Sequence, residues 1–437
     1  MSYKKVKISD IGKIVSGATP KTKDVDNYGG SIAWITPADL SGYTSKYISH
    51  GSRNITQKGY DSCSTHLMPR GTVLFSSRAP IGYVAIAENS ICTNQGFKSI
   101  VPNDDIDSEF LYYQLQYLRK KIQEKGSGTT FKEISGKVLG ETDIVVPSLE
   151  EQFRIVARIE ELFSELDKAV DTLKTTKEQL EVYRQAVLKA AFEGKYTKWW
   201  RKNHNVSANE EYCELRKENQ VFKDTSGDEN ELSLNIPDEW MKVRLGEIFD
   251  VEVGATPSRQ HAEYWNGSIP WVSSGEVRFT TINKTREMIT DIGLKNASTN
   301  LQPIGTVLLA MIGEGKTRGQ SAILNIPAAH NQNTAAILVS KTLCQPKYIY
   351  YFLQLNYENT RRVGSGNNQK ALNKERVRAI RIPFAPIAEQ SIIVKEIEKR
   401  LSICENIEQT VNTALAQADT MRQSILKQAF EGKKDVY

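Results

Sequence analysis

The sequence predicts an α+β fold in which two similar mixed α/β domains are joined by two long antiparallel coiled-coil helices with pseudo-twofold symmetry. Two observations lead to this prediction. Short motifs occur twice in the same order, 237 or 238 residues apart, which indicates a duplicated unit of roughly 200 residues, far longer than a solenoid repeat. Each copy then ends in a long segment with heptad spacing of apolar residues, which is typical of a coiled-coil helix. A two-unit duplication favours pseudo-twofold symmetry.

Five pairs of motifs establish the duplication, because matches in one order at a nearly constant offset are hard to obtain by chance. The pairs are Gly17-Ala18-Thr19-Pro20 with Gly254-Ala255-Thr256-Pro257, Gly30-Ser31-Ile32-Ala33-Trp34 with Gly267-Ser268-Ile269-Pro270-Trp271, Asn94-Gln95 with Asn331-Gln332, Gly126-Ser127-Gly128 with Gly364-Ser365-Gly366, and Ala191-Phe192-Glu193-Gly194-Lys195 with Ala429-Phe430-Glu431-Gly432-Lys433.

Composition favours a soluble globular protein. The chain has 437 residues, 39% hydrophobic and 25% charged, which is enough for two or three domains. A net charge of +5 is compatible with a polyanionic partner but does not require one. The five cysteines are never in CxxC spacing, which argues for a reducing cytoplasm and against a zinc site. Neither a run of 18 apolar residues nor the apolar core of a signal peptide is present, so we expect no membrane span.

Residues 1–148 are predicted to form the first mixed α/β domain, domain 1. Short apolar runs at 72–75 and 83–86, bounded by Gly, Pro and Ser, predict strands. Residues 108–124 carry apolar side chains at helical spacing. The run 143–146, closed by Pro147, predicts a last strand.

A long helix is predicted to follow, in a region spanning 149–195. No Gly or Pro occurs between Leu149 and Phe192, Ser148 with Glu151 has the form of a capping box, and Gly194 can end the helix. Lys177 and Arg184 interrupt the apolar seam. The predicted seam residues are Val156, Ile159, Phe163, Leu166, Val170, Leu173, Leu180 and Val187.

The second copy repeats this plan, with domain 2 predicted over 238–386 and a second long helix over 387–433. Glu408 and Arg422 interrupt its seam. We expect the two helices to bury their seams against each other in antiparallel orientation. The alternative is that each helix packs only on its own domain, but a helix of about 65 Å exceeds the size of a 150-residue domain. The seam residues are Val394, Ile397, Leu401, Cys404, Val411, Leu415, Ala418, Ile425 and Ala429.

The segment 196–237 between the two copies is polar and is predicted to be a surface linker, partly ordered by Trp199 and Trp200.

Catalytic motifs are missing from the sequence. Gly315-Lys316-Thr317 resembles the end of a phosphate-binding loop, but the first Gly of that pattern is replaced by Ala310 and a strand-like run follows. No HExxH, GxSxG or GxGxxG pattern occurs, nor the Asn-Pro-Pro-aromatic tetrapeptide of adenine-N6 methyltransferases. We therefore expect a protein without a catalytic or metal site of its own.

Polar and basic loops at equivalent places in the two copies are the candidate binding surface. The loop with Arg78 in the first copy is three residues longer in the second, where it carries Lys316 and Arg318; a basic loop that varies on a fixed scaffold is typical of a reading surface. Asn94-Gln95 and Asn331-Gln332 are interpreted either as adenine contacts or, preferably, as turn supports. The candidate DNA-binding residues are Lys21, Ser76, Ser77, Arg78, Ser127, Thr129, Thr130, Lys132, Arg259, Lys316, Thr317, Arg318, Ser365, Asn367, Asn368, Gln369 and Lys370.

Together these features resemble the specificity (S) subunit of type I restriction–modification systems, over essentially the whole chain. The motifs that carry the resemblance are Gly17-Ala18-Thr19-Pro20, Thr93-Asn94-Gln95, Pro147-Ser148-Leu149-Glu150-Glu151-Gln152, Phe192-Glu193-Gly194-Lys195 and Ile236-Pro237-Asp238-Glu239-Trp240. Pro386-Ile387-Ala388 before Glu389-Gln390 is a looser copy of the third motif.

The resemblance implies a non-catalytic subunit that gives a DNA methyltransferase and endonuclease complex its sequence specificity. Domains 1 and 2 would be target recognition domains, each reading one half of a bipartite site in double-stranded DNA. The helices would set the spacer and dock two methyltransferase subunits, which restriction subunits join. This chain would need no cofactor, because S-adenosylmethionine, ATP and Mg would belong to the partners. The competing hypotheses are a methyltransferase with its own recognition domain and a coiled-coil scaffold unrelated to DNA.

Overall fold

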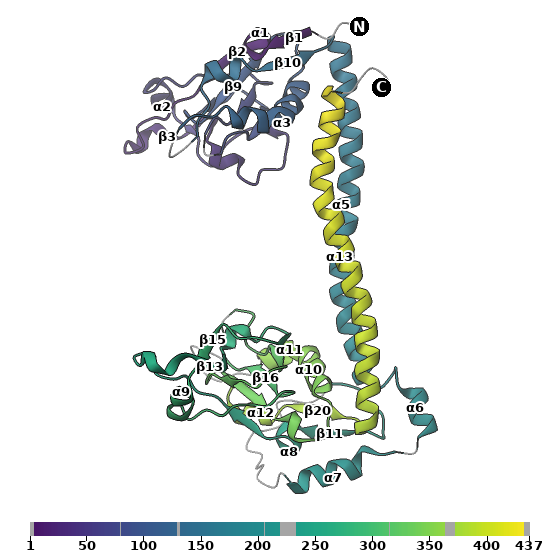
Figure 1. Cartoon of the computed structure of the whole chain (residues 1–437). Helices are drawn as coiled ribbons and strands as arrows, with labels where there is room; N and C mark the ends of the chain where they lie inside the picture. Colours follow the sequence, from purple (N-terminus) through teal and green to yellow (C-terminus); the bar gives the residue numbers. More distant parts are fainter. Residues whose placement is uncertain are drawn as a thin grey trace. The chain divides into compact units, whose positions relative to one another are not determined.

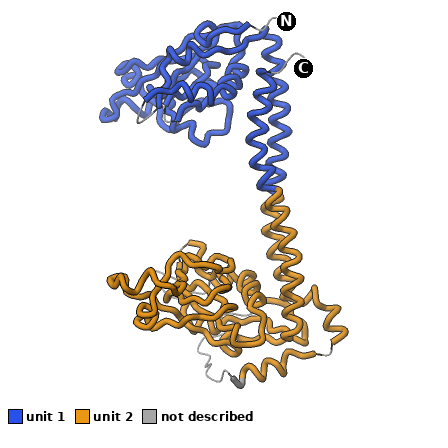
Figure 2. The backbone as a smooth tube through the Cα atoms, in the orientation of Figure 1, with its two compact units in different colours: residues 1–175, 411–437 blue, residues 176–410 orange. Residues whose placement is uncertain are grey.

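A computed structural model describes residues 4–78, 80–128, 132–204, 206–218, 233–313, 315–362 and 372–431. The chain divides into two compact units, one of residues 1–175 with 411–437 and the other of residues 176–410 (Figure 2). Unit 1 therefore contains domain 1, the first part of one long helix and the last part of the other. Unit 2 contains domain 2 and the complementary parts of both helices.

Domain 1 is built on a sheet with strand order β2-β9-β6-β7-β5, and the small sheets β1-β10 and β4-β8 lie beside it. The elements are β1 (Lys4–Lys7), α1 (Ile8–Ile11), β2 (Gly12–Ser16), η1 (Val25–Asn27), β3 (Tyr28–Ile32), β4 (Trp34–Ile35), η2 (Pro37–Leu40), β5 (Tyr47–Ile48), α2 (Gln57–Asp61), β6 (Val73–Phe75), β7 (Val84–Ala87), β8 (Cys92–Thr93), β9 (Lys98–Pro102), α3 (Ser108–Glu124), α4 (Gly136–Gly140) and β10 (Asp143–Val146).

The central strands are apolar at successive positions because both faces of this sheet are covered. Val73 and Phe75 of β6 face a core that includes α3, whereas Leu74 between them packs in a second core with Phe97. Asp107 begins α3 by accepting a hydrogen bond from the backbone N–H of Phe110 at 2.8 Å, as expected of an N-cap aspartate. The predicted helix and strands of domain 1 are thus confirmed.

Domain 2 repeats this topology, with a main sheet of order β12-β19-β16-β17-β14 and the small sheets β11-β20 and β15-β13-β18. Its elements are β11 (Met241–Arg244), α8 (Leu245–Ile248), β12 (Val251–Val253), η3 (Ala262–Tyr264), β13 (Trp265–Val272), η4 (Ser274–Glu276), β14 (Thr280–Ile282), β15 (Glu287–Ile289), α9 (Asp291–Asn296), β16 (Val307–Ala310), β17 (Ser321–Leu324), β18 (Ala329–His330), β19 (Thr334–Ile337), η5 (Val339–Lys341), α10 (Pro346–Leu355), α11 (Tyr357–Arg362), α12 (Lys374–Arg378) and β20 (Arg381–Phe384). The prediction of two similar mixed α/β domains is confirmed.

The two long helices are α5 (Leu149–Phe192) and α13 (Ile387–Glu431), and they lie side by side in each unit (Figure 1). In unit 1 the late residue Arg422 of α13 pairs with Asp167, early in α5. In unit 2 the late residue Arg184 of α5 pairs with Glu408 of α13 at 2.6 Å. The start of one helix thus lies against the end of the other in both units, so the pairing is antiparallel.

The predicted seam is confirmed, because none of its residues is exposed. Val156, Ile159, Leu180, Val187, Val394, Ile397, Cys404, Val411 and Ala418 are buried. Phe163, Leu166, Val170, Leu173, Leu401, Leu415, Ile425 and Ala429 are half-buried, because a second helix alone cannot enclose a side chain.

The end of each helix completes the core of the domain that precedes the other helix in the chain. The end of α5 lies in the core of domain 2, and the end of α13 packs on domain 1. In unit 2, the fully buried Phe192 at the end of α5 packs edge-on against Tyr348 and Phe352 of α10, with ring centroids 5.0 and 5.4 Å apart. In unit 1, Phe430 near the end of α13 packs against Phe110 of α3, with centroids 5.6 Å apart. The alternative in which each helix packs only on its own domain is therefore wrong.

The predicted surface linker is a folded connector in its described part, which corrects the prediction. It contains α6 (Lys198–Asn203) and α7 (Ala208–Glu218). Trp200 is buried as expected, but Trp199 is 58% exposed. On α7 the Glu211 carboxylate accepts a hydrogen bond from the backbone N–H of Ile387 at 2.8 Å, which caps the start of α13.

A buried ion pair fixes this connector to α13. The guanidinium of Arg201 pairs with the fully buried carboxylate of Glu389 and donates to the carbonyl of Gly194 at 2.7 Å. The indole of Trp240 donates to the second carboxylate oxygen of Glu389 at 2.8 Å. Every charged group in this network has a partner, as burial of charge requires. The described segment around Arg201 is ordered because it supplies that partner.

We predict that Phe192→Ala destabilises unit 2 by about 3–5 kcal/mol, because it removes a fully buried aromatic ring from the domain core. Urea unfolding followed by tryptophan fluorescence measures this, since five of the six tryptophans lie in unit 2. Tyr183→Ala, at a 50% exposed position of α5 in unit 2, is the control and should cost no more than about 0.5 kcal/mol. Equal effects of the two variants would contradict the role given to the helix end.

We also predict that unit 2 loses stability in mild acid through His330. Burial lowers the pKa of this imidazole to about 4, although Glu252 opposes the shift. Between pH 6.5 and 4 the unfolded chain binds a proton that the folded chain does not, so the free energy of unfolding falls as the pH falls. The loss from pH 7.5 to 5 is up to about 2 kcal/mol.

Domain 1 carries Thr93 at the position of His330, so His330→Thr is the natural test. The variant should lose less stability than the unmodified chain between pH 7.5 and 5 in the same urea measurement. Identical losses in the two proteins would show that His330 is not responsible for the acid sensitivity.

Candidate nucleic-acid interface

The loops that the sequence identified as candidates lie together in domain 1, linked by contacts between segments far apart in the chain. The hydroxyl of Thr19 donates to the side-chain oxygen of Gln95. The carbonyl of the next residue, Gly96, accepts a hydrogen bond from the backbone N–H of Ser77 at 2.7 Å, and Ser77 in turn accepts one from Ile134 at 2.9 Å. We call residues 17–20, 76–78, 93–96, 126–128 and 132–134 the loop band of domain 1.

Domain 2 has the same band, formed in its described part by residues 254–257, 311–313, 315–319 and 330–333. Thr256 donates to Gln332 at 2.5 Å. The backbone N–H of Met311 donates to Asn333 at 2.8 Å, and Leu372 donates to Met311 at 3.0 Å. The same contacts therefore hold the same loops in both copies.

The repeated Gly-Ala-Thr-Pro motif has a structural cause. A Cβ on Gly17 would lie 2.1 Å from the carbonyl oxygen of Thr93, and a Cβ on Gly254 would lie 1.9 Å from that of His330. No other residue fits such an approach, and the neighbouring Ala18 uses it to donate to Thr93 at 3.0 Å. The motif anchors the band rather than contacting a ligand.

The repeated Asn-Gln turn is also part of the scaffold, as the preferred interpretation predicted. The side-chain oxygen of Asn94 accepts from the N–H of Gly96 at 2.9 Å, and Asn331 accepts from Asn333 at 3.2 Å. These are Asx turns. Trp34, predicted to be core, is buried, and its indole donates to the carbonyl of Ala18 at 3.1 Å. In domain 2 the buried Trp271 donates to the carbonyl of the equivalent Ala255 at 3.0 Å.

The prediction that Ser76 and Ser77 contact DNA is wrong. Both are fully buried, because they directly follow β6, whose side chains pack in the domain core. The hydroxyl of Ser76 donates to Pro80 and accepts from the N–H of Tyr83, both at 2.8 Å, so it shapes the loop. Neither serine is available to DNA.

The remaining described candidates of domain 1 are at the surface. Arg78 is half-buried and its backbone bridges to Glu133, which also pairs with Ser127. Ser127 and Lys132 are exposed. Arg78, Ser127 and Lys132 therefore share one part of the loop band, whereas Thr129 and Thr130 lie outside the described residues.

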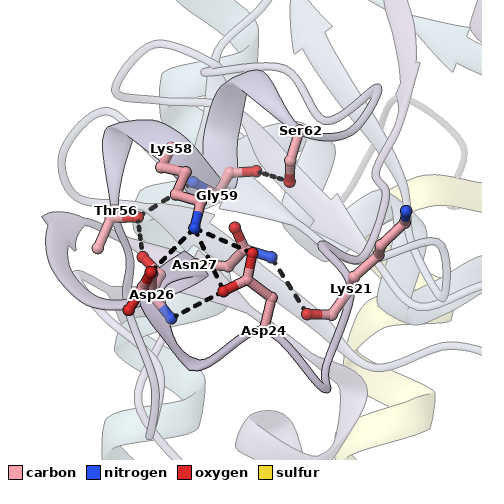
Figure 3. Close-up of polar contacts among 8 residues, drawn as sticks. All are labelled: Lys21, Asp24, Asp26, Asn27, Thr56, Lys58, Gly59 and Ser62. Carbon is pink, nitrogen blue, oxygen red and sulfur yellow. Dashed lines mark hydrogen bonds and ion pairs between the residues drawn. The ribbon is translucent and has the colours of Figure 1, made fainter.

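Lys21 directly follows the Gly-Ala-Thr-Pro motif of the band, and Figure 3 shows its surroundings. Its carbonyl accepts a hydrogen bond from the side chain of Asn27 at 3.1 Å, while its ammonium points away from the cluster. Lys58 pairs with Asp24 and Asp26, both at 3.0 Å. The hydrogen bond from Lys58 holds the pKa of Asp24 below its ordinary value. The ammonium of Lys58 is thus neutralised locally, and that of the exposed Lys21 faces outward.

In domain 2 the longer loop is braced against α11. Arg361 donates to the carbonyl of Gly315 at 2.8 Å, Tyr357 donates to that of Lys316 at 2.5 Å, and Arg318 donates to that of Arg361 at 2.8 Å. Arg318 is half-buried and supports the loop through this hydrogen bond, while its contact with DNA stays a prediction. Lys316 is exposed and Thr317 half-buried.

This loop is followed by strand β17 and not by a helix, which agrees with excluding a phosphate-binding loop of nucleotide-binding proteins. The candidates Ser365, Asn367, Asn368, Gln369 and Lys370 lie outside the described residues. Arg259 is exposed, and its guanidinium lies over the ring of Trp265 beside the band.

No sequence motif marks Tyr28, Arg53 or Glu287. Arg53 lies over the ring of Tyr28, and Glu287 pairs with Arg259. These residues meet only in the folded domain, so the sequence could not identify them.

The described residues contain no cluster of His, Cys, Asp or Glu able to hold a metal ion. No helix in the described ranges has the length and apolar character needed to cross a membrane.

Comparison with known proteins identifies the family. The family model described as the type I restriction modification DNA specificity domain matches twice, at residues 2–182 and 237–417. The chain is 35% identical to the type I restriction enzyme MjaIX specificity subunit of Methanocaldococcus jannaschii over 350 residues, covering 79% of this chain and 74% of the relative. It is 24% identical to the EcoBI specificity subunit of Escherichia coli over 444 residues, covering 99% and 86%.

Solved structures share the fold. A chain from a study of complex assembly and conformational transition of the type I R-M system matches with a TM-score of 0.70 at 18% identity, covering 98% of this chain and 97% of that one. The HsdS subunit of Thermoanaerobacter tengcongensis matches with a TM-score of 0.58 at 19% identity, with the same coverage. From the two matches to the family model and the identity to these relatives, the chain belongs to the type I restriction–modification DNA specificity family.

Proposed function

We propose that each domain of this specificity subunit reads one half of a bipartite site in double-stranded DNA through its loop band. The chain is a specificity component with two recognition domains and not itself an enzyme. One observation carries the proposal: the two bands share their scaffold contacts, and their exposed residues differ. Arg78 corresponds to the exposed Ile312, and the exposed Lys316 belongs to the longer loop of domain 2, which is three residues shorter in domain 1. Two different surfaces on one scaffold suit two different half-sites.

The long helices, we propose, fix the separation of the half-sites. An α-helix of 44 residues measures about 66 Å, and its antiparallel pairing with α13 in each unit stiffens it. The observed pairs Asp167–Arg422 and Arg184–Glu408 set the register of the two helices. A change in helix length would therefore change the spacer and not the half-sites.

The same helices are proposed to dock two methyltransferase subunits. Tyr183 of α5 and Met421 of α13 are 50% and 57% exposed, and they occupy equivalent positions 238 residues apart. Large apolar side chains exposed at two equivalent places favour two copies of one partner. Restriction subunits would join through the methyltransferase subunits, which would bring S-adenosylmethionine, ATP and Mg, so this chain needs no cofactor. Modification of host DNA would take place in the cytoplasm.

We predict that deleting one heptad from each helix shortens the recognised spacer by up to about three base pairs, because seven residues span about 10 Å and a base pair about 3.4 Å. The deletions fall between Asp167 and Arg184 in α5 and between Glu408 and Arg422 in α13, which preserves both observed pairs. Mapping of methylated adenines in cells that carry the modified complex measures the spacer. An unchanged spacer with unchanged half-sites would refute the role of the helices, and absence of any split site would refute DNA reading itself.

We predict that Tyr183→Glu or Met421→Glu each removes one methyltransferase subunit from the complex, and that the double variant removes both. A charge on a contact surface replaces apolar burial with an unpaired carboxylate. The mass of the purified complex gives the number of subunits. Leu343→Glu, at an 80% exposed apolar position of domain 2, is the matched control and should leave two subunits bound. Full occupancy in the double variant would place the docking surface elsewhere.

A further inference from the structure

In both domains an arginine lies over the face of an aromatic ring at the same place in the scaffold. In domain 1 the guanidinium carbon of Arg53 lies 3.7 Å from the ring centroid of Tyr28. In domain 2 that of Arg259 lies 3.6 Å from the ring centroid of Trp265. The two rings are equivalent, because Tyr28 bridges to Ile55 and Trp265 pairs with the corresponding Ile289 of β15.

The two arginines, however, come from different positions in the repeat. Arg53 stands two residues before Ile55, and the residue at that place in domain 2 is Glu287. Arg259 stands two residues after the Gly-Ala-Thr-Pro motif, and the residue at that place in domain 1 is Thr22. The stack is thus retained although its arginine has moved from one segment to another. Simple packing would not require an arginine there, because both stacks are at the surface.

The charge around the two stacks differs. Arg53 is exposed and forms no ion pair within the part of the chain that the structure describes. Arg259 donates through both terminal nitrogens to the carboxylate of Glu287, with Nη2 and Oε2 2.9 Å apart. The two side chains of this pair remain 56% and 37% exposed. Domain 1 therefore presents a free cation, and domain 2 presents a neutral pair.

Both stacks adjoin the loop band. The hydroxyl of Tyr28 donates to the carbonyl of Pro20 in the Gly-Ala-Thr-Pro motif at 2.8 Å. The indole of Trp265 donates to Ser258, directly after the second copy of the motif, at 3.2 Å. Behind each ring lies the buried tryptophan of the same domain, with centroids 6.0 Å apart for Trp34 and 5.2 Å for Trp271. The stacked arginines are therefore fixed to the band by rigid rings.

We propose that this stack contacts DNA in both domains but in two ways: Arg53 binds a backbone phosphate, and the Arg259–Glu287 pair reads a G·C base pair by its edges. The inference rests on the proposed function. A guanidinium held on a ring is pre-organised for hydrogen bonding. A free one attracts phosphate, whereas a carboxylate beside it repels phosphate. Arginine N–H groups match the acceptors of guanine, and a carboxylate accepts from the amino group of cytosine.

The test uses the full chain purified with its methyltransferase partner and two DNA probes of equal length. One is a duplex selected by the complex from a random pool, and the other is a random-sequence duplex. Affinity is measured by fluorescence anisotropy over a range of salt concentrations. Loss of one phosphate contact lowers the slope of log affinity against log salt by about 0.9.

For domain 1, Arg53→Ala should lower the affinity for both probes by a similar factor and reduce the salt slope by about 0.9. Arg53→Lys should keep the slope, because the charge remains. Arg70→Ala, which removes an exposed arginine of the same domain outside the loop band, should leave slope and affinity unchanged. A salt slope that is unchanged in Arg53→Ala would overturn the phosphate contact. A salt slope that falls as much in Arg53→Lys as in Arg53→Ala would overturn it too.

For domain 2, Glu287→Gln should increase the affinity for the random duplex and raise its salt slope, because the released guanidinium can now bind phosphate. It should also weaken the preference for one G·C pair of the selected site by about 5- to 150-fold. The double change Thr22→Arg with Arg53→Glu should transfer the domain 2 behaviour to domain 1. Unchanged selectivity in Glu287→Gln would overturn base reading by the pair.

The outcomes separate this inference from the proposed function. If the unmodified complex does not prefer its selected duplex over the random one, the proposed function fails. The stack proposal alone fails under a different result. In that result the preference holds, and every stack variant melts at the same temperature as the unmodified chain and binds both probes with the same affinity as the unmodified chain. A variant that melts early is replaced by Arg53→Gln or Arg259→Gln, which remove the charge but keep a polar side chain. The salt slope of the first and the base preference of the second then decide.

Discussion

The structure depends on the burial of the C-terminal end of each long helix in a domain core: α5 ends in the core of domain 2, and α13 ends against the core of domain 1. Phe192 at the end of α5 fills the core beneath α10, and Phe430 near the end of α13 packs on α3. Each helix therefore begins in one unit and ends in the other. Since a buried aromatic ring stabilises by several kcal/mol, neither unit is complete without a segment from the distant half of the chain. The two recognition domains are thereby tied to both helices.

This constraint explains why the described part of the connector between the copies is folded. After Phe192 the chain must leave the core of unit 2 and enter domain 2 through β11. The buried pair Arg201–Glu389 fixes that passage, and Glu211 caps α13 next to it. A buried charge without its partner is strongly unfavourable, so the connector can only take the path that pairs both groups. Its order follows from the helix that it contacts.

Segments that repeat in the sequence form the scaffold, and segments that differ form the surface proposed to read DNA. The Gly-Ala-Thr-Pro loop, the Asn-Gln turn and the tryptophans recur because close backbone approach and buried hydrogen bonds allow few alternatives. The stacked arginine follows another rule, since the arrangement recurs while the residue that supplies it does not. The recurrence of the arrangement from a different segment is the observation that supports a role for the stack in DNA contact. The surface proposed to read DNA thus lies on a frame that both domains share.

The sequence by itself determined the duplication, the α+β class, the two helices from Leu149 and Ile387 and their apolar seam, because periodicity and spacing act over a few neighbouring residues. Only the tertiary structure decided which polar residues reach the surface. Ser76 and Ser77 point into the core, Arg318 braces its own loop, and Arg53 and Arg259 meet equivalent rings. Arg318 and Arg53 meet partners 43 and 25 residues away in the chain, whose positions are set by packing of the whole domain.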